Sequence, residues 1–327
     1  MTLKAVAEAA GVSVSAVSYA LRGAPNIPAE TAARVREAAE RLGYRPNARV
    51  GELMAHIRKA RPLARAEPLA LVHLEGKPDA TSVNSFARRV EMAARVRAEA
   101  RGYRLDTFWL SQVRGNARRL ADILEARGIS GVLFAPTVDE RRIELKWPWE
   151  KFAMAVVGMT EWSVPLSRAG HHHYEAMRTA LERLATVGAR RPVALLEAAT
   201  NERAHRGWQA AWLAYGPKDA ARRLWLRRDQ KPGELADWLA GMKVDGIIAD
   251  GGTLAQIVRE TGWAGPAERV VSLSWQPGAG MAGIDQGYDA IAEHAVDLVV
   301  TQLQRNERGL PSPPHMLLFP GRWREAE

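Results

Sequence analysis

The sequence predicts an N-terminal all-α helix-turn-helix headpiece followed by an α/β body of two lobes with two parallel sheets. In the first 45 residues, apolar side chains recur at helical spacing in three short segments. From about residue 67 onward, short apolar runs alternate with amphipathic stretches, which is typical of parallel strands with crossover helices. At 327 residues the chain is too long for one compact domain of ordinary size. We therefore expect a headpiece over residues 1–45, a hinge helix and linker over 46–61, and a two-lobed domain over 62–327.

The first two predicted helices are joined by a tight turn. Residues 3–10 carry an apolar stripe at helical spacing, and Gly11 follows where the turn requires a residue that readily adopts positive φ. Ser13 is positioned to cap the N-terminus of a second helix over about Val14–Leu21. In a helix-turn-helix unit, the outward face of this second helix enters the major groove of DNA. That face carries Val14, Ser15, Ala16, Ser18 and Tyr19.

A third helix is predicted over Ala29–Leu42. Pro28 precedes it and Gly43 follows it, in keeping with the preference for proline at the start of a helix and glycine just beyond its end. Three short helices in this order indicate a DNA-reading unit, and three small helices that merely pack together are the alternative. The predicted buried stripe of the third helix consists of Ala33, Val35, Ala38, Ala39 and Leu42.

The N-terminal string TLKAVAEAAGVSVSAVSYALRG, followed by AARVREAAERLGYRPN, resembles the headpiece of LacI/GalR-type (lactose-repressor family) transcriptional regulators almost position by position. The resemblance implies a homodimer on double-stranded operator DNA, in which each recognition helix reads one half-site of a palindrome. It extends more loosely to the C-terminus, where it implies a periplasmic-binding-protein-like (type I) body with a small effector in the cleft between the lobes. The DNA-binding residues that it implies are Thr2, Leu3, Ser13, Val14, Ser15, Ser18, Tyr19, Arg22, Asn26, Tyr44, Asn47, Arg49 and Leu53.

The segment after the headpiece, residues 46–54, occupies the place of the family's hinge helix. The resemblance implies that this helix folds only when two copies meet in the minor groove, where a leucine from each wedges into a central base step. Leu53 lies at the position of that leucine. Gly51 lowers the helix propensity by about 1 kcal/mol relative to alanine, so we expect the hinge to be disordered without DNA. An ordinary apolar contact of Leu53 and Met54 with the body is the alternative.

Charge and composition agree with a DNA-binding protein. The chain has 46 Lys and Arg against 37 Asp and Glu, which gives a formal net charge of +9. Residues 1–61 contain ten Lys or Arg and five Asp or Glu, so this fifth of the chain carries +5 of that charge. A basic protein without a nucleic-acid partner would not need this asymmetry. Because the sequence has no cysteine and no apolar run long enough to cross a bilayer, we expect a cytoplasmic protein with no membrane partner.

The body is predicted to contain two sets of alternating strands and helices. In the first lobe, strands are expected at residues 69–74, 105–110, 131–135 and 153–158, with helices at 86–101 and 116–127. In the second lobe, strands are expected at 193–196, 223–226, 246–250 and 270–274, with helices at 174–187, 204–214, 235–240 and 254–261. The resemblance implies three crossings between the lobes, which we place near residues 160–165, 284–287 and 313–317.

Ligands in open α/β sheets bind beyond the carboxyl ends of the strands, so the cleft is expected to form there. Indole rings suit stacking on a flat ring or a sugar face, although most of the tryptophans are expected in the core or the dimer interface. The candidate effector-binding residues are Trp109, Thr137, Trp162, His172, His173, Arg203, Asp250, Trp275 and Asp285.

The predicted cleft departs from the family's sugar-binding pattern at three places. His172 and His173 stand where a pair of acidic or amide side chains is common, and Ala204 stands where an arginine is common. The pair Gly251-Gly252 stands where Asn-Asp is common. Two interpretations remain open. Either the effector is a sugar or related metabolite unlike a typical hexose, or the cleft has lost its response to a ligand.

We expect no enzyme activity, no cofactor and no metal site. The run His171–His173 suggests metal ligation, but side chains at adjacent positions diverge on strands and helices alike. The sequence contains no G-x-S-x-G elbow, no phosphate-binding glycine loop and no acid pair at useful spacing. The predicted function is a sequence-specific DNA-binding transcriptional repressor modulated by a small molecule. The alternatives are a solute-binding or sensor module with a non-specific headpiece, and a regulator that needs no effector.

Overall fold

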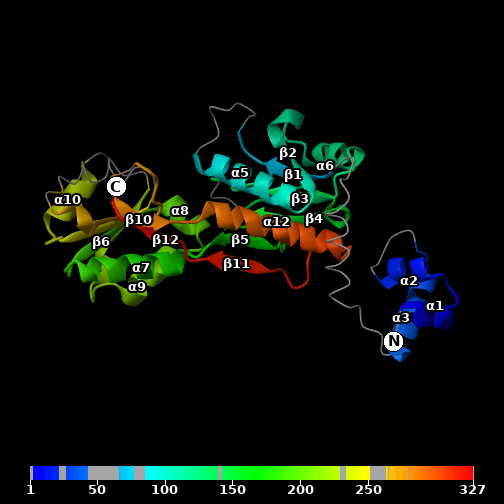
Figure 1. Cartoon of the computed structure of the whole chain (residues 1–327). Coiled ribbons are helices and arrows are strands. Elements are labelled where there is room, and N and C mark those ends of the chain that lie inside the picture. The colour runs from blue at the N-terminus through cyan, green and yellow to red at the C-terminus, as the bar shows by residue number, and fades with distance from the viewer. Residues whose placement is uncertain are drawn as a thin grey trace.

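The computed structural model describes residues 3–21, 27–42, 66–76, 85–138, 142–228, 233–250, 263, 265–278 and 280–326. The headpiece consists of α1 (Leu3–Ala10), α2 (Val14–Leu21) and α3 (Ala29–Arg41), as expected from the sequence (Figure 1). Gly11 has a φ of +65°, and the Ser13 hydroxyl accepts a hydrogen bond of 3.1 Å from the Ala16 amide, so both the turn and the cap form as predicted.

Small apolar side chains fill the headpiece core. Arg34 of α3 donates a 2.7 Å hydrogen bond to the Ala10 carbonyl and thereby satisfies a free acceptor at the end of α1. One predicted core position is wrong. Ala33 is exposed and Ala32 packs against the core instead, because the inward stripe of α3 is one residue out of phase there. The buried core residues are Val6, Ala7, Ala10, Val17, Ala20, Val35, Ala38 and Ala39.

The first lobe is built around a parallel sheet in the order β11-β5-β4-β3-β1-β2. Apolar residues on one face of this sheet pack against α5 and α12, and those on the other face pack against α6 and the aromatic cluster of Phe134, Trp147 and Trp162. The strands are β1 (Glu67–His73), β2 (Tyr103–Trp109), β3 (Gly131–Phe134), β4 (Ala153–Val157), β5 (Arg168–His171) and β11 (Met316–Phe319), and the helices are α5 (Ser85–Ala100), α6 (Ala117–Ala126) and α12 (Tyr288–Gln304), with single turns η1 (Leu110–Val113) and η2 (Trp149–Lys151).

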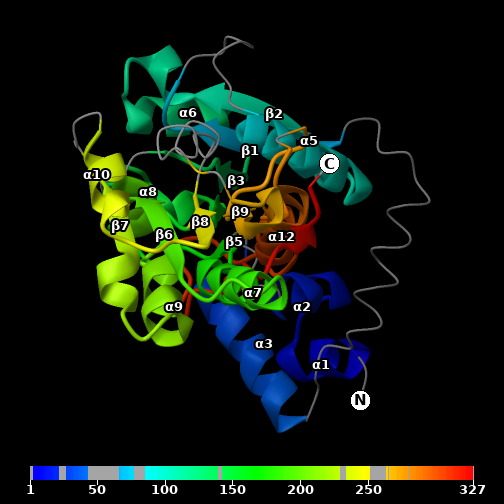
Figure 2. The same cartoon turned by 90° about the vertical axis from the view of Figure 1, so that its left-hand side faces the viewer.

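The second lobe has a sheet in the order β12-β10-β9-β8-β6-β7, parallel except for β12, which pairs antiparallel with β10. In Figure 2, α7 and α9 lie together on one side of this sheet and α10 on the other, in agreement with the two apolar clusters of the lobe. The strands are β6 (Pro192–Glu197), β7 (Leu224–Arg227), β8 (Gly246–Ala249), β9 (Val270–Ser272), β10 (Ala282–Asp285) and β12 (Arg322–Arg324), and the helices are α7 (His173–Thr186), α8 (Ala198–Arg203), α9 (Gly207–Tyr215) and α10 (Glu234–Ala240), with single turns η3 (Ala220–Arg223) and η4 (Ala267–Arg269).

The chain passes between the lobes at three places, and two of them differ from the prediction. The crossing between β10 and α12 lies where residues 284–287 were expected to place it. The first crossing lies at His172 rather than at 160–165, and the last lies between β11 and β12 rather than at 313–317 (Figure 1). Both shifts have one cause. β5 and the edge strand β11 pair with each other in parallel and extend the first sheet before the chain leaves it.

Two helices also differ from expectation. The helix expected over residues 204–214 begins only at Gly207, as α9, because a turn in which His205 and Arg206 adopt positive φ of 52° and 55° separates it from α8, a short helix that was not expected. The long helix α12 was not anticipated, and the helix expected over residues 254–261 lies outside the described residues. Across the described ranges, no helix combines the length and apolar composition needed to span a membrane.

Candidate functional site

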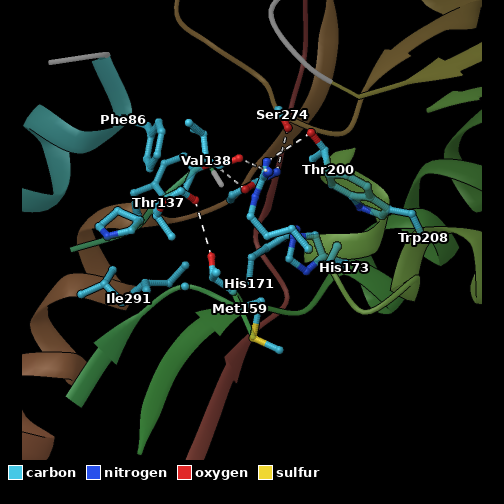
Figure 3. Close-up of a pocket in the computed structure, with 18 residues that line it drawn as sticks. Phe86, Thr137, Val138, Met159, His171, His173, Thr200, Trp208, Ser274 and Ile291 are labelled. Carbon is cyan, nitrogen blue, oxygen red and sulfur yellow. Dashed lines mark hydrogen bonds between the residues drawn. The ribbon is translucent and has the colours of Figure 1, made fainter. Parts of the chain in front are cut away.

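A cavity of about 340 Å³ lies between the two lobes at the carboxyl ends of their strands. Figure 3 shows side chains from both lobes around it. The first lobe contributes the loops after β3 and β4 together with Phe86, and the second contributes α8, His173 and Trp208. Its lining residues include Thr137, Val138, Met159, Thr160, His171, Thr200, Arg203, Ser274, Gln286, Tyr288 and Ile291.

Arg203 joins the two lobes across this cavity. Its Nη1 donates a 2.9 Å hydrogen bond to the Val138 carbonyl in the first lobe, and its Nη2 donates a 3.1 Å bond to the Thr200 hydroxyl in the second (Figure 3). Among the described lining residues, Arg203 is the only Arg, Lys, Asp or Glu. The cavity therefore presents one fixed positive charge in an otherwise neutral wall.

Two histidines of the predicted run line the cavity as neutral imidazoles. Burial lowers the pKa of His171 to about 3 and holds the pKa of His173 well below its ordinary value. The His173 ring meets the rings of His171 and Trp208 edge-on, with centroid distances of 4.9 and 4.7 Å. His171 is 3% exposed, and no described group makes a hydrogen bond of ordinary geometry with either of its ring nitrogens. Both ring nitrogens are buried and lie near the backbone of Phe319 and Gln286.

A second hydrogen-bonded group is fixed at the crossing between β10 and α12. The Gln286 amide donates to the Leu273 carbonyl at 2.9 Å and to the Ser274 hydroxyl at 2.8 Å. The Tyr288 hydroxyl in turn donates to the Gln286 side-chain oxygen at 2.6 Å, and burial raises the pKa of Tyr288 to about 12. These polar groups are oriented before any ligand arrives, which reduces the entropy lost on binding.

Of the nine predicted effector-binding residues, Thr137, His173 and Arg203 line the cavity. His172 instead caps α7, where its Nδ1 accepts a 3.2 Å hydrogen bond from the Glu175 amide. Trp109 stacks on His73 with a centroid distance of 5.0 Å.

The remaining four predicted residues are also held by protein partners. Trp162 is buried in the aromatic cluster of the first lobe, and Trp275 lies 5.5 Å from the Arg324 guanidinium. Asp285 accepts a 3.1 Å hydrogen bond from Arg324. Asp250 is buried and accepts a 2.8 Å bond from the Glu197 amide. None of the four is among the residues that line the cavity.

The prediction missed the aromatic residues that do line the cavity. Trp208 lies beneath His173 on α9, and Phe86 and Tyr288 begin helices of the first lobe. The sequence contained one usable signal. An aromatic residue directly after a predicted crossing, as Tyr288 is, enters the cleft from the start of the returning helix.

The structure describes only part of the predicted DNA interface. Ser13 is exposed and caps α2. The backbones of Leu3, Val14, Ser15, Ser18 and Tyr19 belong to α1 and α2, whereas their side chains lie outside the described part. Also outside the described residues are Thr2, Arg22, Asn26, Tyr44, Asn47, Arg49 and Leu53.

A helix-turn-helix headpiece joined to a two-lobed body with an interlobe cavity defines a class of DNA-binding regulators. Residues 2–47 match the family model of bacterial regulatory proteins, lacI family. The chain is 24% identical over 254 residues to the HTH-type transcriptional regulator RafR of Escherichia coli, covering 76% of this chain and 70% of that protein. It is 53% identical over 47 residues to the HTH-type transcriptional regulator AglR of Rhizobium meliloti (strain 1021), covering 14% of this chain and 13% of that protein.

Solved structures share the fold of the whole chain. A transcriptional regulator CelR-cellobiose complex covers 100% of this chain and 99% of its own, with a TM-score of 0.56 at 19% identity. A Lac repressor dimer bound to operator and an anti-inducer covers 97% of this chain and 96% of its own, with a TM-score of 0.55 at 16% identity. The N-terminal segment is therefore similar to the headpiece of lacI-family regulators, and the chain as a whole is similar in fold to transcriptional regulators of known structure.

Proposed function

We propose that this regulator is a cytoplasmic homodimeric repressor that binds a palindromic operator and responds to a small molecule in the interlobe cavity. The single observation that carries the proposal is the combination of a complete headpiece core with a cavity bridged by Arg203. A ligand that contacts both lobes stabilises one arrangement of them, and it changes operator affinity only if that arrangement favours or opposes DNA binding.

The proposed division of the chain is a headpiece over 1–45, a hinge over 46–61 and a two-lobed domain over 62–327. The described headpiece core shares no residue with the cores of either lobe, which supports a separate folding unit. We place the operator contacts on α2 and on the hinge, with Leu53 as the minor-groove wedge.

The chemistry of the cavity favours an uncharged polyol as the effector, which is the sugar-type alternative. Trp208 and Phe86 offer aromatic surfaces, whereas hydroxyls of Thr137, Thr200 and Ser274 offer hydrogen bonds. The volume of about 340 Å³ lies within the range of small-molecule sites, which argues against a cleft that has lost its ligand. One neighbouring structure is a complex with cellobiose.

Operator selection from a random DNA pool, combined with sedimentation of the protein–DNA complex, tests the first half of the proposal. We expect a palindromic consensus and two chains per operator. Leu53→Ala should weaken operator binding by a few kcal/mol, on the order of one unstacked base step, without changing the stability of the body. A non-palindromic consensus bound by one chain would contradict the proposal.

A thermal-shift screen of sugars, sugar acids and nucleobases against the full chain tests the second half. Arg203→Gln should abolish the shift produced by a true effector, because Arg203 lines the cavity. Arg206→Gln is the matched control, since this neighbouring arginine is exposed and pairs with Glu202 at 2.9 Å. If no compound shifts the wild type and operator binding is normal, the chain is an effector-independent regulator.

A further inference from the structure

A second recess, of about 370 Å³, lies beside β5 and the edge strand β11. We call it the arginine recess. It shares no described lining residue with the interlobe cavity. It is lined by Arg142, Glu161, Trp162, Ser163, Val164, Pro165, Leu166, Arg168, His205, Pro314, His315 and Met316.

Arg168 forms the buried end of this recess. It is 8% exposed, and its Nη1 donates a 2.9 Å hydrogen bond to the Thr160 carbonyl. No carboxylate of a described residue lies within ion-pair distance of it, and burial lowers its pKa. A guanidinium removed from water without a carboxylate partner carries a desolvation cost that a bound anion would offset.

Strand geometry explains why Arg168 lies on this side of the sheet. Side chains alternate between the two faces of a strand, and Ala169 packs into the core on the α12 face. Arg168 therefore projects from the opposite face, next to Trp162 and Leu166. β11, which lies beside β5 in Figure 1, borders the recess because Met316 pairs in register with Arg168.

The mouth of the recess carries further nitrogen donors. Arg142 has a side chain that is 55% exposed and lies 3.6 Å from Glu161, the one carboxylate among the described lining residues. Two histidines also line the recess, and one of them, His315, directly precedes β11. His205 comes from the second lobe, and its Nε2 is 2.7 Å from the Met159 carbonyl of the first lobe.

We propose that the arginine recess binds a small oxyanion, a carboxylate or phosphate group held by Arg168 and Arg142, at a site separate from the interlobe cavity. Two guanidinium groups provide planar pairs of N–H donors that match the geometry of an oxyanion. Glu161 is 61% exposed at the mouth and is already neutralised by Arg142, so it opposes the anion only weakly. Because His205 belongs to the other lobe, the anion occupies a junction of the two lobes.

Titration calorimetry of the full-length protein with inorganic phosphate, at ionic strength held constant with chloride, tests this proposal. Wild type should bind phosphate saturably in addition to any weak association with the basic headpiece. Arg168→Gln should weaken the saturable site about tenfold or more, as expected for a lost charge-assisted hydrogen bond. Glutamine removes the charge but keeps a polar N–H group in the recess, which limits the structural damage.

Two further variants keep the result interpretable. Arg142→Gln changes an exposed side chain, so it should weaken phosphate binding without changing the melting temperature even if Arg168→Gln unfolds the protein. Arg118→Gln, on the exposed face of α6, removes the same charge elsewhere and should leave the affinity unchanged. Repeating the titrations with acetate distinguishes a carboxylate site from a phosphate site, and dependence on Arg168 or Arg142 supports the proposal in either case.

Three outcomes would overturn the proposal. One is the absence of saturable binding of either anion to the wild type. Another is unchanged affinity in both Arg168→Gln and Arg142→Gln, which would reduce Arg168 to a structural donor for Thr160. The third is loss of binding in Arg203→Gln alone, which would place the anion in the interlobe cavity.

Discussion

The headpiece and the interlobe cavity differ in how much of each the sequence predicts. Over 47 residues at the N-terminus the identity to one regulator is 53%, whereas over 254 residues the identity to another is 24%. The headpiece elements also appear where the sequence placed them, whereas only three of nine predicted effector-binding residues line the cavity. We infer that fewer residues can be substituted in a small headpiece than in a cleft whose shape depends on the sheets behind it.

Packing explains part of this difference. Five of the eight buried residues of the headpiece core are alanines, so its helices approach closely and a larger side chain would overpack them. The less buried cavity-lining side chains, such as Val138, by contrast border open space, where they can change without disturbing the sheets. The fold of the body depends on buried strands such as β4 and β8, of which only Val157, at the end of β4, lines the cavity.

The largest expected contrast between the two regions is in salt dependence. Operator affinity should fall about a thousandfold or more between about 50 and 200 mM salt, since each neutralised phosphate releases counterions. Effector affinity should change little, because one arginine is the only fixed charge that lines the described cavity. Filter binding and calorimetry over this salt range measure both. An operator affinity that hardly varies with salt would contradict the proposal that the headpiece binds DNA.

The next largest effect is expected for Trp208→Ala. Trp208 is 1% exposed and supports His173 beside the cavity, so the loss of its indole should destabilise the body by about 3–5 kcal/mol. The headpiece should keep its stability, because its core contains no residue of the body. Urea denaturation followed separately for the two units measures this. Trp208→Phe is the control and should cost much less, whereas equal loss in both units would show that they fold together.

How much of the molecule could be predicted from its sequence depended on the kind of signal. Helical periodicity, Gly11 and Ser13 are local signals, and they gave the headpiece helices to within a residue. Buried strands with continuous apolar runs, such as β3 and β4, were found for the same reason. The resemblance of residues 2–47 to lacI-family headpieces could be recognised because it depends on this local pattern.

The misplaced elements depend on contacts distant in sequence. β5 (Arg168–His171) includes an arginine, a glycine and a histidine and is stabilised as a strand by pairing with β4 and β11. The helix α12 is apolar around much of its surface because it packs against both the first sheet and α5, so its amphipathic signal is weak.

The tryptophans chosen as cleft residues lie outside the cavity for a similar reason. Aromatic composition does not reveal whether an indole faces the core or a cleft, and Trp162 and Trp275 proved to have protein partners. Residues of the cavity therefore became identifiable only when the positions of the strand ends were known.

A smaller effect is expected from Asp250, a buried carboxyl of the second lobe. The described core of the headpiece contains no buried carboxyl. Burial raises the pKa of Asp250 from its ordinary 3.8 to about 7. The folded protein thus binds more protons than the unfolded chain between these values, so Asp250 lowers stability as pH rises through that window. Asp250→Asn should stabilise the body by a few kcal/mol at about pH 8 and hardly at all at about pH 4.

Asparagine keeps the oxygen that accepts the hydrogen bond from the Glu197 amide, so the substitution changes little but the charge. Denaturation of wild type and variant at the two pH values provides the comparison. A variant less stable than wild type at the higher pH would show that the charged carboxylate is stabilised in the fold.

The smallest expected effect concerns how the headpiece reads its operator. Residue 19 is a tyrosine on α2, and a phenol offers a single hydroxyl and an aromatic face, which suit phosphate or thymine methyl contact. A guanidinium at this position can bind guanine O6 and N7 together, so Tyr19→Arg should shift the preference of each half-site toward guanine by about 1–3 kcal/mol. Selection from a random DNA pool with both proteins measures the shift.

Tyr19→Phe is the matched control, because it keeps the aromatic face and should keep the wild-type consensus if that face makes the contact. If wild type and Tyr19→Arg selected the same sites, residue 19 would read no base, and specificity would depend on the remaining outward residues of α2.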